Sequence, residues 1–243
     1  MKRAALLLAV AAAVLLAACG GDDEATQVSD ARMYFLLDGK VWPVANDVEG
    51  RDDVEITMRS LDALVAGLSE DAAEIGMTTA IRPDLEVVSL TTDDGTVQLE
   101  LSETLSGAAL AQVVYTATQS EGLEAVEIEG TTYTRADFED QTPSVLVESP
   151  LAFEQVTSPL RAEGTANTFE ANFHYELTDT DGLIVDENFV TATSGTGTRG
   201  TFEFTTKPYT VPFDGIGSLI VFERSAEDGS RMNIVEIPLR MSR

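Results

Sequence analysis

The sequence predicts two folded parts of different class: a small α/β (α+β) domain with a mixed sheet, followed by an all-β sandwich. Two observations support this prediction. Between residues 32 and 139, short apolar runs with strand character alternate with stretches of helical periodicity. After residue 143 the helical periodicity disappears, and roughly seven strand-like segments follow, separated by turn signals. The 243 residues suffice for one or two domains.

The first part begins with two short strands and a helix. The apolar run 33–37 ends at Asp38-Gly39, which is a turn signal. Residues 40–44 continue as a second strand, in which Pro43 permits only an edge position. The helix is predicted by one apolar stripe with the spacing i, i+3, i+4 and i+7. Its members are Leu61, Leu64, Val65 and Leu68.

Two more strands, a second helix and a final strand complete this part. Residues 84–90 and 96–101 flank Asp94-Gly95, a strong hairpin dipeptide. The segment 123–128 alternates and ends before Gly130. The second helical stripe consists of Leu110, Val113, Val114 and Ala117. This order of elements predicts helices packed on a mixed sheet.

Several motifs of this part, taken in order, resemble the GerMN domain of sporulation and spore-germination proteins. They are "YFLLDGKVWPV", "RSLDALVAGL", "SLTTDDGTVQLELS", "LAQVVYTAT" and "LEAVEIEGTTY", and the resemblance covers residues 32–139. Family members often place Gly-Pro after the first helix, whereas this chain has Gly67-Leu68-Ser69. The resemblance implies the fold but supplies no established catalytic residue.

The polar segment 135–143, "RADFEDQTP", ends in Pro and predicts the domain boundary. The clearest strand beyond it predicts one apolar and one solvated face. The apolar set is Phe169, Ala171, Phe173, Tyr175 and Leu177, and the polar set is Glu170, Asn172, His174 and Glu176. The Cys-Trp-Cys signature of antibody domains is absent from the sequence, so the predicted sandwich is immunoglobulin-like only in a loose sense.

This second part resembles the immunoglobulin-like domain associated with bacterial spore-germination proteins. The resemblance rests on "VESPLAFEQVTSPLRAEGTANTFEANFHYELTD", "GTRGTFEF" and "LIVFERSAEDGS", and it covers residues 144–241. We therefore assign residues 144–243 to an immunoglobulin-like β-sandwich domain. A GerMN domain followed by this domain behind a lipobox is known in bacterial envelope lipoproteins.

The N-terminus predicts a lipoprotein signal peptide over residues 1–18. A basic start precedes an apolar run that is too short to span a membrane, and Leu16-Ala17-Ala18-Cys19 resembles a lipobox. The resemblance implies cleavage before Cys19 and acylation of its sulfur, with the protein on the outer face of the cell membrane. Residues 19–31 are small, polar and acidic, which predicts a flexible linker.

The composition is strongly acidic. The formal net charge is -27, from 42 acidic and 15 basic residues. Such a surface is a very poor partner for nucleic acid. A solubility or salt adaptation explains it more simply than cation storage.

The segment "SGTGTRGTF" contains a G-x-G-x-x-G at Gly195, Gly197 and Gly200. A dinucleotide loop needs a helix directly after it, because the phosphate sits on the helix N-terminus. Here the β-patterned "TFEFT" follows. We therefore interpret the segment as a strand connection and expect no nucleotide and no other cofactor.

Candidate metal ligands are few. His174 is the only histidine, and it shares a predicted strand face with Glu170 and Glu176. Zinc normally requires more His or Cys ligands, so we expect an exposed strand face and no metal. The segment 179–182 resembles the start of a calcium loop but lacks the distal ligands, which favours a hairpin turn.

The predicted function is a non-catalytic, lipid-anchored binding or structural module of the cell envelope, with the membrane and an envelope protein or wall component as partners. Trp42 could stack on a ligand, although packing is the commoner role. Two alternatives remain. One is a peptidoglycan-acting enzyme that uses paired carboxylates, since the many acidic residues permit many pairs. The other is a solute-binding lipoprotein.

Overall fold

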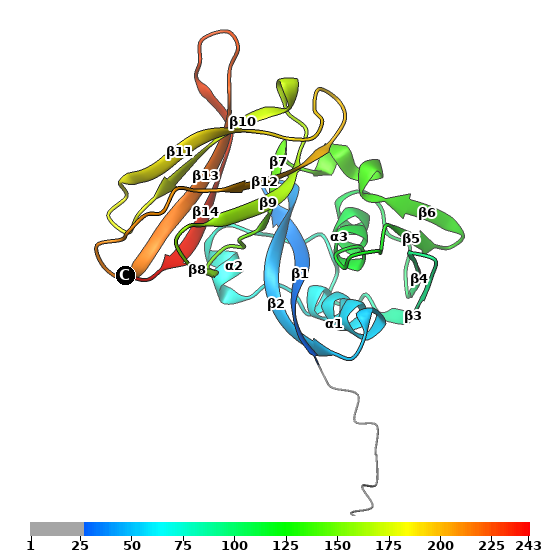
Figure 1. Cartoon of the computed structure of the whole chain (residues 1–243). Helices are drawn as coiled ribbons and strands as arrows, with labels where there is room; N and C mark the ends of the chain where they lie inside the picture. Colours follow the sequence, from blue (N-terminus) through cyan, green and yellow to red (C-terminus); the bar gives the residue numbers. More distant parts are fainter. Residues whose placement is uncertain (1–26) are drawn as a thin grey trace, which may run out of the picture.

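The structure, a computed structural model, describes residues 27–243 (Figure 1). The predicted fold class is confirmed: a mixed α/β part precedes an all-β sandwich. The predictions for the signal peptide, for Cys19 and for the linker up to residue 26 lie outside the described residues.

The first two strands form a hairpin much longer than the sequence pattern predicted. β1 (Gln27–Leu37) and β2 (Lys40–Gly50) pair antiparallel along their whole lengths. β1 therefore takes in residues 27–31, which were predicted as linker. Beyond the apolar run, Ala31 and Val48 form a small core of their own with Ile56. This second cluster explains why the hairpin extends further than its most apolar stretch.

The two longer helices, α1 and α3, lie between this hairpin and a four-stranded sheet, as Figure 1 shows. The sheet has the order β3-β4-β5-β6 and is mixed, because β4 and β5 run parallel. The prediction of helices on a mixed sheet is thus correct, but the hairpin forms a separate layer on their other side. The elements are α1 (Asp53–Ala66), α2 (Glu70–Glu74), β3 (Val87–Asp93), β4 (Thr96–Leu101), α3 (Gly107–Ala117), β5 (Ala125–Ile128) and β6 (Thr131–Thr134).

Local capping and burial explain both helices. The Asp52 carboxylate accepts a hydrogen bond from the Glu55 amide at 2.9 Å and caps α1. The helix stops at Gly67, whose φ of 100° few other residues adopt, so Leu68 of the predicted stripe lies beyond its end. α3 is buried on nearly all sides. Its Gln112 amide donates to the Tyr34 carbonyl at 2.9 Å, which satisfies a polar group in the core.

The second part is a sandwich of two sheets, with the orders β11-β10-β13-β14-β8 and β12-β9-β7. A 3-10 helix, η1 (Arg135–Gln141), leads into it and occupies the predicted boundary. Its elements are β7 (Val145–Ser149), β8 (Gln155–Val156), β9 (Arg161–Ala166), η2 (Phe169–Ala171), β10 (Asn172–Thr178), β11 (Ile184–Thr191), β12 (Gly200–Thr205), β13 (Gly215–Arg224) and β14 (Arg231–Met241).

The alternation predicted from Phe169 onward is correct only from Phe173. Phe173, Tyr175 and Leu177 are buried, but Phe169 is 65% exposed. The reason is the short 3-10 helix η2 before the strand, in which Ala171 has a φ of 60°. This turn breaks the two-residue period, so Phe169 does not share the inward face.

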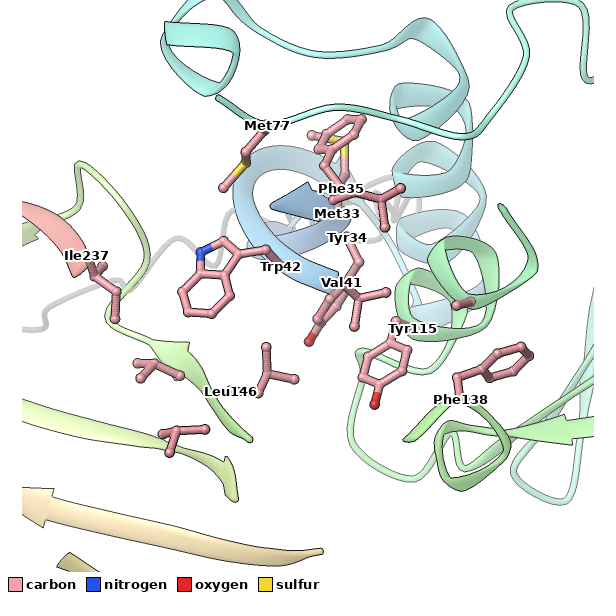
Figure 2. Close-up of a cluster of buried hydrophobic side chains, with 14 of the residues drawn as sticks. Met33, Tyr34, Phe35, Val41, Trp42, Met77, Tyr115, Phe138, Leu146 and Ile237 are labelled. Atoms are coloured by element: carbon pink, nitrogen blue, oxygen red, sulfur yellow. The ribbon is translucent and has the colours of Figure 1, made fainter. Parts of the chain in front are cut away.

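The two parts share one continuous hydrophobic core. A single cluster of buried side chains includes Tyr34 and Tyr115 from the first part and Leu146 and Ile237 from the sandwich. Figure 2 shows the Trp42 indole between the hairpin and Ile237 of β14. Trp42 is only 4% exposed, which confirms a packing role. The parts are therefore packed together and not joined only by chain connectivity.

Candidate functional site at the domain junction

The junction between the two parts is organised around Arg135, the first residue of η1. Its guanidinium donates to Glu148 Oε1 at 2.7 Å and to the carbonyl oxygens of Tyr115 and Thr118 at 3.2 and 2.9 Å. Its central carbon lies 5.2 Å from the ring centroid of Tyr34 and 4.7 Å from that of Tyr115, which gives two cation–π contacts. One side chain thus connects the hairpin, α3 and the sandwich.

Glu148 of β7 is the main acidic partner in this cluster. The Tyr34 hydroxyl donates to the same carboxylate oxygen as Arg135, and Arg32 Nε donates to the Glu148 carbonyl at 2.9 Å. Burial opposes the charged form of Glu148, but Arg135 and the Tyr34 hydroxyl stabilise it and hold its pKa below the usual range. Burial also raises the pKa of Tyr34, so its hydroxyl remains a hydrogen-bond donor.

A second ion pair crosses the junction at Glu139 of η1. Arg199 binds its carboxylate through two hydrogen bonds, Nη2 to Oε1 at 2.9 Å and Nε to Oε2 at 3.0 Å. The same guanidinium donates to the Pro143 carbonyl at 2.8 Å, and Asn167 Nδ2 donates to Glu139 at 2.8 Å. The hydrogen bond from Arg199 lowers the pKa of Glu139. This paired geometry makes the contact stronger and more directional than a single bond.

Arg199 lies in the glycine-rich segment, which connects β11 to β12 with no helix after it. The interpretation as a strand connection is confirmed. A Cβ at Gly195 would lie 2.5 Å from the Ala171 amide nitrogen, and one at Gly200 would lie 2.3 Å from that of Ser194. The glycines therefore permit close backbone packing, which places Arg199 against η1.

A groove of about 510 Å³ lies beside the junction, between the hairpin and the sandwich. Its volume falls within the range typical of ligand sites, roughly 300–1,000 Å³. The exposed Ile234, 56% accessible to solvent, lies on its sandwich side. The lining residues are Leu37, Asp38, Lys40 and Trp42 from the hairpin, Pro143 and Ser144 from the connection, and Asn233, Ile234, Val235 and Glu236 from β14.

The residues considered for metal binding do not form a site. His174 stacks on Phe222 with ring centroids 5.6 Å apart, and burial, together with Arg224, lowers its pKa. Glu176 was predicted to be solvated, but it is buried and paired with Arg231 at 2.6 Å. Glu170 lies in η2. Within residues 27–243, no group of three His, Cys, Asp or Glu side chains could hold a metal ion.

The segment 179–182 is a turn between β10 and β11, as predicted. The Asp179 carboxylate accepts hydrogen bonds from the amides of Asp181 and Leu183 at 2.9 and 3.0 Å. Gly182 has a φ of 77°. The carboxylate therefore stabilises the local backbone, as in other Asx turns.

Sequence reasoning missed the four charged residues of the junction, Arg135, Glu139, Glu148 and Arg199. The available signal was weak: Arg135 and Arg199 are two of only 15 basic residues beside 42 acidic ones. In such a chain, an arginine in a polar boundary segment favours an internal acidic partner. Its partner could not be found without the fold, because Arg199 and Glu139 lie 60 residues apart.

This arrangement can hold two domains together and present a groove between them. The charged groups of the junction bind one another, and in the described part of the chain His174 has no hydrogen-bonded nucleophile. No helix among residues 27–243 is long and apolar enough to cross a membrane.

Comparisons with known proteins find a family match for each of the two parts. Residues 32–134 match a family described as sporulation and spore germination, and residues 144–230 match the immunoglobulin-like domain of bacterial spore germination. The expected resemblance to these two families, in this order, is confirmed. No curated protein matches the chain. A crystal structure of a candidate lipoprotein from Clostridium perfringens has 13% identity and a TM-score of 0.32, over 51% of this chain and 97% of that one.

Proposed function

We propose that this chain, in which a sporulation and spore germination domain precedes an immunoglobulin-like domain of bacterial spore germination, is a non-catalytic binding module of the cell envelope. In this proposal, a lipid on Cys19 holds residues 32–139 and 144–243 at the outer face of the cell membrane. Residues 19–26 would then give the two domains reach from the membrane surface.

The observation that carries the proposal is the junction. Two domains that share a core and two ion pairs present a groove built from both of them, which favours specific binding. Preorganisation of this kind lowers the cost of ordering a site when a partner binds. The junction carboxylates are already paired with arginines, which suits a structural role better than proton transfer. A general base must instead lie within hydrogen-bond reach of a substrate proton.

Incubation with purified sacculi distinguishes a binding module from an enzyme that acts on peptidoglycan. We expect the Cys19→Ala protein, produced without the signal peptide of residues 1–18, to release no muropeptides, whether or not it sediments with the wall. Release of soluble muropeptides would overturn the non-catalytic proposal, provided that a carboxylate variant abolishes it. Glu163→Gln and Glu203→Gln are the first variants to test, since both side chains line a separate hollow of about 550 Å³ and share Arg161.

The anchor is tested separately by cell fractionation. Wild-type protein should sediment with the membranes, and the Cys19→Ala protein should remain uncleaved or appear in the soluble fraction without a lipid label. Incorporation of a labelled fatty acid into wild type but not into the variant identifies Cys19 as the modified residue. Equal labelling of both would contradict the anchor.

A further inference from the structure

The outer edge of β14 is open along the groove. On one side β14 pairs with β13 along nearly its full length. On the other side its only strand partner is β8, at Arg240 and Met241. The stretch before these residues, which lines the groove at residues 233–236, has no strand beside it among residues 27–243. Unpaired strand edges are templates for a further strand.

The direction of the β14 backbone groups follows from two hydrogen bonds. The Pro238 carbonyl accepts a hydrogen bond from the Phe153 amide at 2.6 Å, and the Arg240 amide donates to the Glu154 carbonyl at 2.9 Å. Both groups therefore point away from β13. The direction of the backbone N–H and C=O groups alternates from one residue to the next along a strand. Glu236 lies two residues before Pro238, so its N–H and C=O also point away from β13, toward the groove. In the described chain neither group has a backbone partner on that side.

The groove also supplies contacts for side chains of an added strand. Leu37, Trp42 and Pro143 are the apolar residues that line the groove outside β14. A bulge at residues 233–234, with Asn233 at a φ of 50°, ends the regular edge and limits the added strand to a short segment. Its side chains would alternate between the apolar residues of the groove and solvent.

The charges around the edge favour a basic occupant. Two carboxylates, Asp38 and Glu236, and one lysine, Lys40, line the groove, so the negative charges outnumber the positive one. The Lys40 ammonium donates to the Asp140 carbonyl at 2.6 Å, and the Ser218 hydroxyl donates to Glu236 Oε1 at 2.7 Å. The chain as a whole carries a formal charge of -27. A second copy of the chain would bring the same negative charge to the edge, which disfavours self-association. A segment with Lys or Arg would be attracted to it.

We propose that the β14 edge at Glu236 binds a short, extended, Lys- or Arg-bearing segment of a partner protein by strand addition in this groove. The inference rests on the proposed function, because it names the class of partner for the binding module. Backbone hydrogen bonds at Glu236 give the register, Leu37 and Pro143 contact an apolar side chain, and Glu236 and Asp38 face the basic ones.

A synthetic peptide tests this inference. The probe is KVKVKVK, titrated into the Cys19→Ala protein and followed by the fluorescence of Trp42, the only tryptophan. We expect a saturable change and protection of the Glu236 amide in hydrogen exchange. EVEVEVE and the block sequence KKKKVVV, which lacks the alternation, should bind about tenfold more weakly or worse.

Glu236→Pro is the critical variant. It removes the outward N–H, and Pro238 shows that β14 accepts proline at a position of the same direction. We expect affinity for KVKVKVK to fall about tenfold, with an unchanged circular dichroism spectrum. Glu236→Gln keeps the N–H and separates the effect of charge, and Glu163→Gln on the other sheet is the matched charge control.

The remaining outcomes overturn the inference. Equal affinity of KVKVKVK for wild type and Glu236→Pro would exclude strand addition, and so would a loss of equal size in Glu163→Gln. A dimer that disappears in Glu236→Pro would assign the edge to a second copy. If wild type and Glu236→Pro sediment equally with sacculi while neither binds KVKVKVK, the binding module remains and this edge is not its site.

Discussion

At the scale of single residues, the junction depends on charged groups that are removed from solvent. Arg135 and Glu148 retain 27% and 14% of their side-chain exposure, and each has several partners. Removing one member of such a pair costs more than the pair contributes, because the other charge is left without compensation. The effect of a substitution therefore reports the burial of the pair.

Replacing Arg135 by Met should lower the free energy of unfolding by about 3 kcal/mol, because Glu148 loses its main cation in a poorly solvated site. Urea denaturation measures the change. Arg161→Met is the matched control: its ion pairs are exposed and should contribute far less to stability. Equal, small losses in both variants would show that the Arg135 pair is not buried.

The two ion pairs of the junction, Arg135–Glu148 and Arg199–Glu139, predict a pH dependence of stability. In the folded protein the pKa values of Glu148 and Glu139 lie below the ordinary glutamate value of 4.5. Their contribution is therefore complete above that value and is lost as pH falls below it, since the unfolded state then binds more protons. The melting temperature should fall below pH 4.5, and less steeply in Glu148→Gln. An unchanged slope in this variant would count against the pair.

At the scale of elements, the sequence predicted the helices and the hairpin turn that depend on local residue patterns. The apolar stripes gave α1 and α3, and Asp94-Gly95 gave the β3–β4 hairpin. The full length of β1 and β2 could not be predicted, because their outer halves are stabilised by each other and by Ile56 of α1. The burial of Glu176 could not be predicted either, because its partner Arg231 lies 55 residues further along the chain.

The glycine-rich segment offers a prediction at this scale. Arg199→Ala should destabilise the protein by about 2 kcal/mol, because it removes a bidentate bond to Glu139 and a hydrogen bond to the Pro143 carbonyl. Added nucleotide should leave the melting temperature of wild type unchanged, since no helix follows Gly200. Thermal unfolding measures both, and stabilisation by a nucleotide would contradict this account of the segment.

At the scale of the whole molecule, the shared core and the two ion pairs predict that the domains unfold together. The interface buries Trp42 beside Ile237, so its fluorescence reports the junction directly (Figure 2). The sequence could indicate two domains but not their packing, because the contacts join residues from distant segments. The shape of the groove depends on this packing.

Thermal unfolding of the Cys19→Ala protein, followed by calorimetry and by Trp42 fluorescence, tests this central claim most directly. We predict one calorimetric transition that coincides with the fluorescence change, and a single transition at lower temperature in Arg135→Met. Two separate transitions in the wild-type sequence, with Trp42 exposed at the first, would show that the domains are independent and would contradict a preformed groove.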